Sequence, residues 1–154
     1  MLCLIGGFMF LQACNDECEG VTCNNGGVCD DGTCQCDEGY TGSSCDDEQR
    51  AGLVGTWIGN SICDTEPATA TTVIILEGTS VSEIVLTQVG IENLNATITG
   101  VNTFDIEPFI DTTGSLDITT IGNGSINENG QVVINYNQEV EGIVVETCVF
   151  TGAQ

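Results

Sequence analysis

From residue 53 onward, hydrophobic and polar positions alternate in short segments, which Gly, Asn or Ser interrupt at intervals of roughly 8 to 12 residues. Leu94 to Thr99 alternates strictly, and so does Phe104 to Glu107 until Pro108 ends the pattern. A period of two in segments rich in Val, Ile and Thr predicts half-buried β-strands, and no long helical period occurs. This part of the chain is therefore expected to be mainly β.

Turn signals separate these segments into about eight expected strands of an antiparallel barrel or sandwich. Asn129-Gly130 predicts a hairpin with a type I′ turn, because both residue types accept positive φ. The expected strands lie near residues 53–60, 71–78, 83–89, 94–100, 102–109, 115–121, 124–128 with 131–138 as a hairpin, and 143–151.

Six cysteines between residues 18 and 45 mark a different kind of structure. A segment this short buries too little apolar surface to fold without cross-links or a metal. The chain has no histidine, which favours disulfides. Spacing alone does not choose among the pairings of six thiols.

The segment CEGVTCNNGGVCDDGTCQCDEGYTGSSC, with its turn Gly39 to Gly42, resembles an EGF-like module. The resemblance implies pairing of the first cysteine with the third, the second with the fourth and the fifth with the sixth. The implied bridges are Cys18–Cys29, Cys23–Cys34 and Cys36–Cys45.

Calcium is a partner that the resemblance raises but does not favour. Calcium-binding EGF modules have an acidic cluster before the first cysteine and an Asp or Asn with an aromatic residue between the third and fourth. Asp16 and Glu17 supply part of the first element, whereas the segment 30–33 is too short and lacks the aromatic residue. We therefore expect no metal site in this module.

The apolar segment from Leu2 to Leu11 is shorter than the about 20 residues that a membrane-spanning helix needs, and it predicts a signal peptide over residues 1–13. Leu11-Gln12-Ala13-Cys14 resembles the lipobox of bacterial lipoproteins, which implies acylation of Cys14 with fatty acids such as palmitate. The usual Lys or Arg after Met1 is missing. The alternative is an ordinary signal peptide with Cys14 as a spare thiol.

Cysteine parity supports the lipid anchor. If Cys3 leaves with the signal peptide and Cys14 is acylated, six of the ten cysteines belong to the module, and only Cys63 and Cys148 are left to pair. Asn15 to Glu17 resembles the acidic export signals of some Bacteroidota lipoproteins, or is simply a polar tether. Two or more acyl chains hold a protein stably to a membrane.

Charge and composition exclude several functions. One basic residue, Arg50, stands against 23 acidic ones, and the formal net charge of −22 excludes nucleic-acid partners. Without histidine or lysine there is no Ser-His triad, Schiff base or imidazole zinc site. Carboxylates remain, but Asp105 and Glu107 alternate with apolar residues, and with Asp111 they are expected on a solvated face. We expect no enzyme and no cofactor.

Gly55-Thr56-Trp57 resembles the Gly-x-Trp of lipocalin-like barrels, in which the tryptophan lies on the first strand. That family places an Arg or Lys on the last strand, and Ile143 to Thr151 has neither. Trp57 is accordingly a ligand-contacting residue or a core aromatic. A Cys63–Cys148 bridge would require the first and last strands to be neighbours, as in a closed barrel.

These features predict a Bacteroidota-type lipoprotein at the outer membrane or cell surface. Its β-domain would bind a protein or a small apolar ligand, and the EGF-like module would serve as a spacer. The alternative is a structural or adhesive secreted protein with a solid barrel. The expected divisions are a signal peptide at 1–13, a lipidated tether at 14–17, the module at 18–45, a linker at 46–52 and the lipocalin-like β-domain at 53–154.

Overall fold

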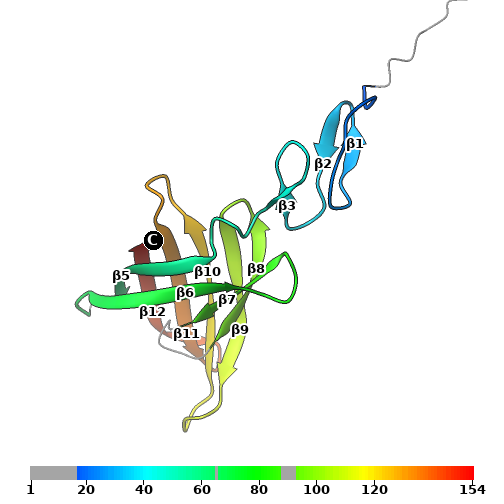
Figure 1. Ribbon diagram of the computed structural model, residues 1–154. Coiled ribbons are helices and arrows are strands. Elements are labelled where there is room, and N and C mark those ends of the chain that lie inside the picture. Colours follow the sequence, from blue (N-terminus) through cyan, green and yellow to red (C-terminus); the bar gives the residue numbers. More distant parts are fainter. Residues whose placement is uncertain (1–16, 65, 88–92) are drawn as a thin grey trace, which may run out of the picture.

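The structure is a computed structural model that describes residues 17–64, 66–87 and 93–154. Within these ranges the chain forms strands and turns and no helix, so none of the described segments is a helix able to cross a membrane. A cysteine-rich module and a barrel follow one another along the chain (Figure 1). The expected signal peptide and the expected attachment site at Cys14 lie outside the described residues.

The EGF-like module consists of two small hairpins. In the first hairpin, Asp31 and Gly32 both have positive φ, at 46° and 78°, as a tight primed turn requires. In the second, residues that were expected in the linker pair with residues before Cys45, so the ordered module continues to Glu48. The hairpins are β1 (Val28–Asp30) with β2 (Thr33–Gln35), and β3 (Tyr40–Thr41) with β4 (Asp47–Glu48).

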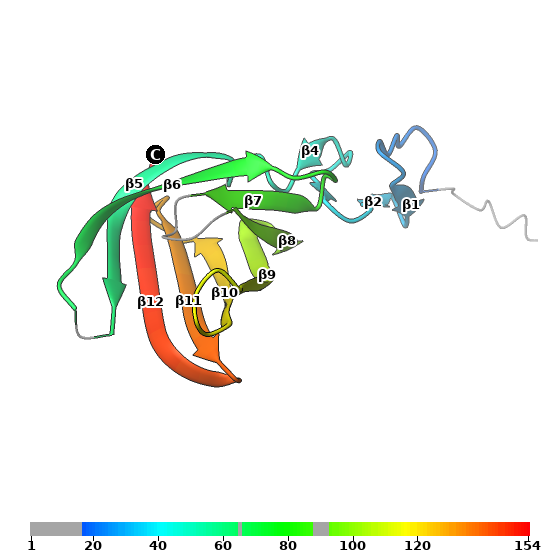
Figure 2. The same cartoon turned by 90° about the horizontal axis from the view of Figure 1, so that it is seen from below.

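Eight antiparallel strands form a closed barrel, in which each strand pairs with its neighbours in sequence and the last pairs with the first. Figure 2 shows the strands curving round a common interior. This confirms the predicted β fold and its strand number, and it decides for a barrel over a sandwich. The strands are β5 (Gly55–Cys63), β6 (Thr69–Glu77), β7 (Glu83–Thr87), β8 (Leu94–Gly100), β9 (Thr103–Asp111), β10 (Ile118–Ile126), β11 (Val132–Val140) and β12 (Ile143–Ala153).

One predicted strand break is wrong. The expected strands at 115–121 and 124–128 are one strand, β10, which runs through Gly122 and Gly124. Both glycines lie opposite aromatic side chains, because Gly122 pairs with Tyr136 and a Cβ on Gly124 would collide with the ring of Phe104. These glycines make room for large neighbours inside the barrel, and they do not end the strand.

The alternation on β9 stops at Pro108 as predicted, whereas the turn predicted at Asn129-Gly130 needs correction. Strand β9 continues through Pro108, which sits at a β-bulge where the register against β10 shifts. A bulge leaves its extra residue unpaired, so a missing N–H is tolerated there. At Asn129-Gly130 a hairpin does form, but only Gly130 has positive φ. Asn127 Oδ1 accepts hydrogen bonds from the backbone N–H groups of Asn129 and Gln131, which fixes a longer loop.

The barrel has two chemically different ends. We call the end beside the EGF-like module the module end; it contains the start of β5 and the hairpin turn between β6 and β7 (Figure 1). The opposite end is the far end, where β11 turns into β12 at Glu141 and Gly142. The apolar core includes side chains with at most 2% exposure, namely Leu53, Trp57, Val73, Ile75, Ile84, Leu86, Leu94, Ala96, Phe104, Val132, Ile134, Cys148 and Phe150.

Candidate functional site

Among the described residues, four disulfides join the pairs named from the sequence. Three lie in the EGF-like module, and each joins cysteines 9 or 11 residues apart. The fourth joins Cys63 on β5 to Cys148 on β12, with Cα atoms 4.0 Å apart. Because these two residues are direct cross-strand partners, the bridge lies on the seam that closes the barrel. The module bridges are Cys18–Cys29, Cys23–Cys34 and Cys36–Cys45.

Trp57 lies in the core and is 2% exposed. Its indole Nε1 donates a 2.8 Å hydrogen bond to the backbone carbonyl of Leu53, which is itself fully buried just before the first barrel strand. A buried indole needs such a partner for its N–H. The structure thus places Trp57 as a core aromatic that closes the module end, and its polar atom is already occupied.

The three carboxylates considered for catalysis all lie on one strand, β9. Asp105 and Glu107 are exposed on the outer face of β9, and Glu107 accepts a hydrogen bond from Thr97. Asp111 lies at the end of the same strand. Two hydrogen bonds from Thr113 stabilise the charged form of Asp111 and hold the pKa of that carboxyl below its usual range. The bond from the backbone N–H has the larger effect, and the bond from the hydroxyl the smaller one.

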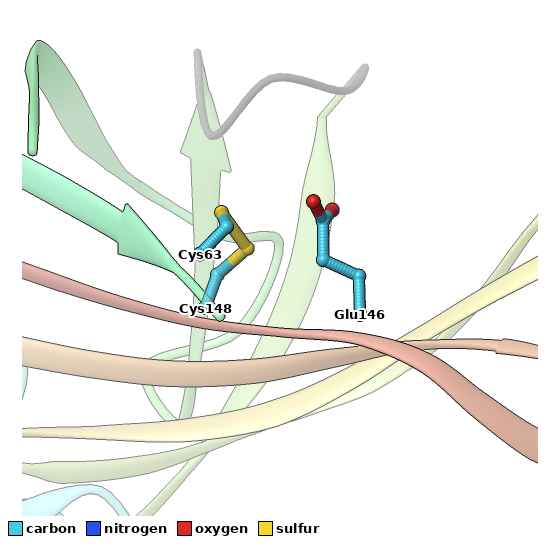
Figure 3. A group of neighbouring side chains, drawn as sticks. All are labelled: Cys63, Glu146 and Cys148. Atoms are coloured by element: carbon cyan, nitrogen blue, oxygen red, sulfur yellow. A yellow bond between two sulfur atoms is a disulfide. The ribbon is translucent and has the colours of Figure 1, made fainter. Parts of the chain in front are cut away.

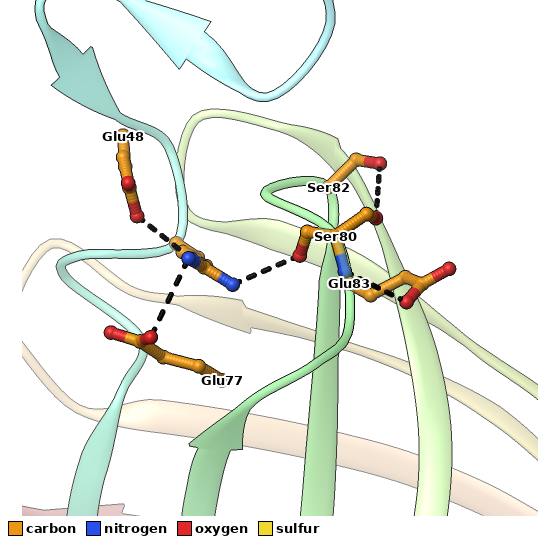
Figure 4. Close-up of polar contacts among 6 residues, drawn as sticks. Glu48, Glu77, Ser80, Ser82 and Glu83 are labelled. Atoms are coloured by element: carbon orange, nitrogen blue, oxygen red, sulfur yellow. Dashed lines mark hydrogen bonds and ion pairs between the residues drawn. The ribbon is translucent and has the colours of Figure 1, made fainter.

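The only basic residue of the chain joins the EGF-like module to the barrel. Arg50 donates to the carboxylate of Glu48 at 2.8 Å, and its Nη2 lies 3.5 Å from a carboxylate oxygen of Glu77 at the end of β6. Its Nη1 donates to the backbone carbonyl of Ser80 at 2.9 Å. Figure 4 shows Glu48, Glu77 and Ser80 around the guanidinium group. The planar fork of arginine can serve three acceptors at once.

Two further features fit the module against the turn between β6 and β7. The buried Gly39 has φ of 86°, and a Cβ there would meet Val81, so this position requires glycine for both conformation and space. The turn itself is stiffened by Glu83, which accepts from the hydroxyl of Thr79. Glu83 also accepts from the backbone N–H of Ser80, as Figure 4 shows. These bonds lower the pKa of Glu83, the Thr79 hydroxyl having the largest effect.

We expect Arg50→Ala to loosen this junction while leaving both parts folded. Exposed ion pairs contribute about 1 kcal/mol or less, so the main effect should be on orientation rather than on unfolding. Nuclear spin relaxation should then give different rotational correlation times for the module and the barrel. Arg50→Lys is the control, because it keeps the charge but not the three-way fork, and its effect should be intermediate. A common correlation time in Arg50→Ala would contradict this role.

Inward-facing side chains differ between the two ends of the barrel. Near the module end they are apolar and almost fully buried, and they include Leu53, Trp57 and Ile84. Toward the far end the same alternation brings polar groups inward, and most of them are only half-buried. We call this set the far-end wall; it consists of Ser61, Thr71, Phe109, Thr120, Tyr136, Gln138, Glu146 and the Cys63–Cys148 disulfide.

Strand register places three polar members of the far-end wall side by side on β10, β11 and β12. Thr120 on β10 is the cross-strand partner of Gln138 on β11, and Gln138 is the partner of Glu146 on β12. Figure 3 shows Glu146 beside the disulfide, on the same side of β12. Its carboxylate lies within 4.8 Å of both sulfur atoms. Because these sulfurs are bonded to each other, they supply no thiolate ligands, and this cluster does not form a metal site.

Two hydroxyls of this wall have no partner. The side-chain oxygens of Ser61 and Thr120 are buried, and neither makes a hydrogen bond within the described structure. Thr120 as a whole is 1% exposed. An unpaired buried hydroxyl costs about 1 to 3 kcal/mol, so such groups normally have a partner in a protein, a water or a ligand.

Described residues line three surface hollows, and most of these residues face outward from the barrel. One of about 350 Å³ lies over β6, β7 and β8 and includes Glu77, Glu83 and Glu107. A second, of about 410 Å³, lies over β9, β10 and β11. The third, of about 430 Å³, is at the far end and includes Ile110 and Leu116. Of the far-end wall, only Tyr136 lines one of these hollows, the second.

Sequence reasoning did not find the far-end wall. Along β11 the inward positions read Val132, Ile134, Tyr136 and then Gln138, so a polar residue replaces an apolar one at a position predicted to face the core. Thr120 on β10 and Glu146 on β12 are likewise polar residues at inward-facing positions. Polar residues at inward positions can be read from the sequence of each strand. That they form one wall can be recognised only when the strands are aligned.

The fold defines a disulfide-stapled EGF-like module joined to an eight-stranded up-and-down β-barrel. Residues 14–48 match a family model described as a teneurin-like EGF domain. The first part of the chain is therefore similar to that domain. No curated protein and no solved structure matches the chain. The module is thus identified as EGF-like, and the architecture is consistent with a binding or structural role.

Proposed function

We propose that the protein is a lipid-anchored binding protein of a bacterial cell envelope, in which the EGF-like module spaces the barrel from the membrane. The observation that carries this proposal is the docking of the module on one end of the barrel (Figure 1). Arg50 and the β6–β7 turn hold that end, and the far end is directed away from the module. An anchor at Cys14 would therefore present the far end outward, at the outer membrane or cell surface.

The barrel would bind a protein or a small ligand with an apolar part. Up-and-down barrels of eight strands are the architecture of lipocalins, which hold one small ligand, and this supports a lipocalin-like role. The half-buried far-end wall supports it further. The packed core at the module end favours the second candidate, a structural or adhesive secreted protein.

Other properties of the proposal follow from charge. The formal net charge of −22 supports a protein without nucleic-acid partners. Acidic surfaces attract calcium, but in the module Asp30 and Asp31 are exposed at a tight turn, and we do not propose a calcium site there. The solvent exposure of Asp105 and Glu107 on the outer face of β9 supports a protein that is not an enzyme.

The anchor is tested by Cys14→Ala in a bacterium with lipoprotein-processing enzymes. We expect the wild-type chain to incorporate labelled palmitate and the variant to incorporate none, because the thiol is the proposed acceptor. Cys3→Ala is the matched control; it also removes one thiol before the module, and it should keep the label. Undiminished labelling of Cys14→Ala would contradict the anchor.

A further inference from the structure

The hollow of about 410 Å³ over β9, β10 and β11 gathers amide side chains on the outer face of the barrel. Asn123 on β10 is the direct cross-strand partner of Asp105 on β9 and of Asn135 on β11. Directly opposed side chains on one face of a sheet have Cβ atoms about 4.5 to 5.5 Å apart, so these three polar groups form a continuous row. Asn137 lies beside this row, opposite Ile121. We call this hollow the amide hollow; its polar side chains are Asp105, Asn123, Asn135 and Asn137.

The bulge on β9 keeps a second carboxylate out of the amide hollow. At the register shift, β9 has two residues, Glu107 and Pro108, where β10 has only Ile121. Bulges re-aim side chains in this way. Glu107 accepts a hydrogen bond from Thr97 on β8 and lines the hollow over β6, β7 and β8. Pro108 lines the amide hollow, where it adds an apolar ring beside Ile121. The amide hollow thus has an apolar side and a single carboxylate.

The polar groups of the amide hollow have unused hydrogen-bonding capacity. Within the part of the chain that the structure describes, the side-chain amides of Asn123, Asn135 and Asn137 make no hydrogen bond. Each amide offers two N–H donors and a carbonyl acceptor, whereas the carboxylate of Asp105 only accepts. A ligand that fits this row must therefore accept and donate hydrogen bonds at neighbouring points. A hydroxyl group does both, and a sugar ring presents several adjacent hydroxyls.

Charge and topology narrow the class of ligand. An anion is repelled, because Asp105 lines the hollow and the formal net charge of the chain is −22. A cation would find more carboxylates in the neighbouring hollow over β6, β7 and β8, where Glu77, Glu83 and Glu107 gather. A peptide that binds as an added strand needs a sheet edge, and the described barrel is closed. A neutral ligand with several hydroxyls remains, and small-ligand sites typically have volumes of about 300 to 1,000 Å³, a range that includes this hollow.

We propose that the amide hollow binds a neutral saccharide. Ring hydroxyls accept hydrogen bonds from the amides of Asn123 and Asn135 and donate to Asp105, and the C–H face of the sugar packs on Ile121 and Pro108. The site lies on the outer face of the barrel, so it goes beyond the proposed function and needs neither the lipid anchor nor a ligand inside the barrel. An open site with few apolar contacts is expected to bind in the millimolar range.

Titration of the isotope-labelled full chain, followed by two-dimensional NMR, tests the proposal because it detects weak binding and locates it. The probes are the neutral trisaccharides maltotriose, mannotriose, galactotriose and chitotriose, and the anionic trigalacturonate. We expect at least one neutral probe to shift the side-chain amide signals of Asn123, Asn135 and Asn137, and trigalacturonate to shift none of them. Absence of shifts at these signals with every neutral probe would overturn the site, and so would equal shifts with trigalacturonate.

Asn135→Ala removes the amide at the end of the row and should weaken binding of that neutral probe by about fivefold, the effect of losing one hydrogen bond. Asn123→Asp keeps the shape of the side chain but replaces its donors with a second carboxylate beside Asp105, and it should weaken binding at least as much. Asn95→Ala is the matched control, because Asn95 is also exposed on the outer face, on β8 in the neighbouring hollow. It should leave binding unchanged, and the same spectra show that each variant is folded. Equal weakening by Asn135→Ala and Asn95→Ala would show nonspecific contact with surface amides and would overturn the site.

Discussion

Replacing both Cys63 and Cys148 with alanine should lower the free energy of unfolding of the barrel by up to about 4.5 kcal/mol in the chain-entropy model. The bridge spans 85 residues, nearly the whole barrel, so its loss frees a long loop in the unfolded chain. It also joins the first strand to the last at the closing seam. Urea unfolding of the wild type and the double variant, followed by tryptophan fluorescence, measures the difference, because Trp57 lies in this barrel.

The control is a pair of substitutions at the neighbouring cross-strand position, Ile62→Ala with Val149→Ala. These side chains lie on the same two strands but on the outer face, where Ile62 is 48% exposed. Cross-strand pairs contribute about 1 kcal/mol or less, so the control should be much milder than loss of the bridge. Equal losses from the two pairs would show that the disulfide adds nothing beyond local packing.

Trp57→Ala should destabilise the barrel by about 3 to 5 kcal/mol, since it removes a large buried side chain and leaves a cavity at the module end. It also leaves the carbonyl of the buried Leu53 without its indole donor. Trp57→Phe keeps most of the ring and loses the hydrogen bond, so its effect should be smaller. Thermal unfolding followed by circular dichroism measures both variants.

Ile58→Ala serves as the comparison, because Ile58 is the next residue on β5 and is 69% exposed on the outer face. Exposed substitutions usually change stability by about 0.5 kcal/mol or less. If Trp57→Ala were as mild as Ile58→Ala, the ring would not be part of the packed core, and a role in ligand contact would regain support.

The strands of the barrel could be predicted because one face of each is buried and the other is solvated. Alternation then shows in the sequence, as it does from Leu94 to Thr99. The prediction fails where a residue has a different role from its usual one. Gly122 and Gly124 usually mark breaks, yet here they accommodate Tyr136 and Phe104 within a continuous strand. At Pro108, by contrast, the alternation stops as predicted, because a bulge shifts the register there while the strand continues.

The disulfides and the far-end wall show a similar contrast. The resemblance to EGF-like modules and the parity of cysteines named all four pairs, because covalent partners are few. The wall joins Thr120, Gln138 and Glu146 from three strands. Two register shifts, one beside Thr120 and one beside Gln138, decide which residues face each other. Such shifts depend on cross-strand packing, which alternation within a single strand does not reveal.

The place of Arg50 has a consequence for proteolysis. Trypsin cleaves after Lys or Arg, and the sequence offers it a single peptide bond, between Arg50 and Ala51. That bond lies between the module and the barrel, and the arginine side chain is 12% exposed and paired on both sides. Cleavage therefore requires the junction to open. The rate at which trypsin divides the chain into its two disulfide-bonded parts is a direct measure of how often they separate.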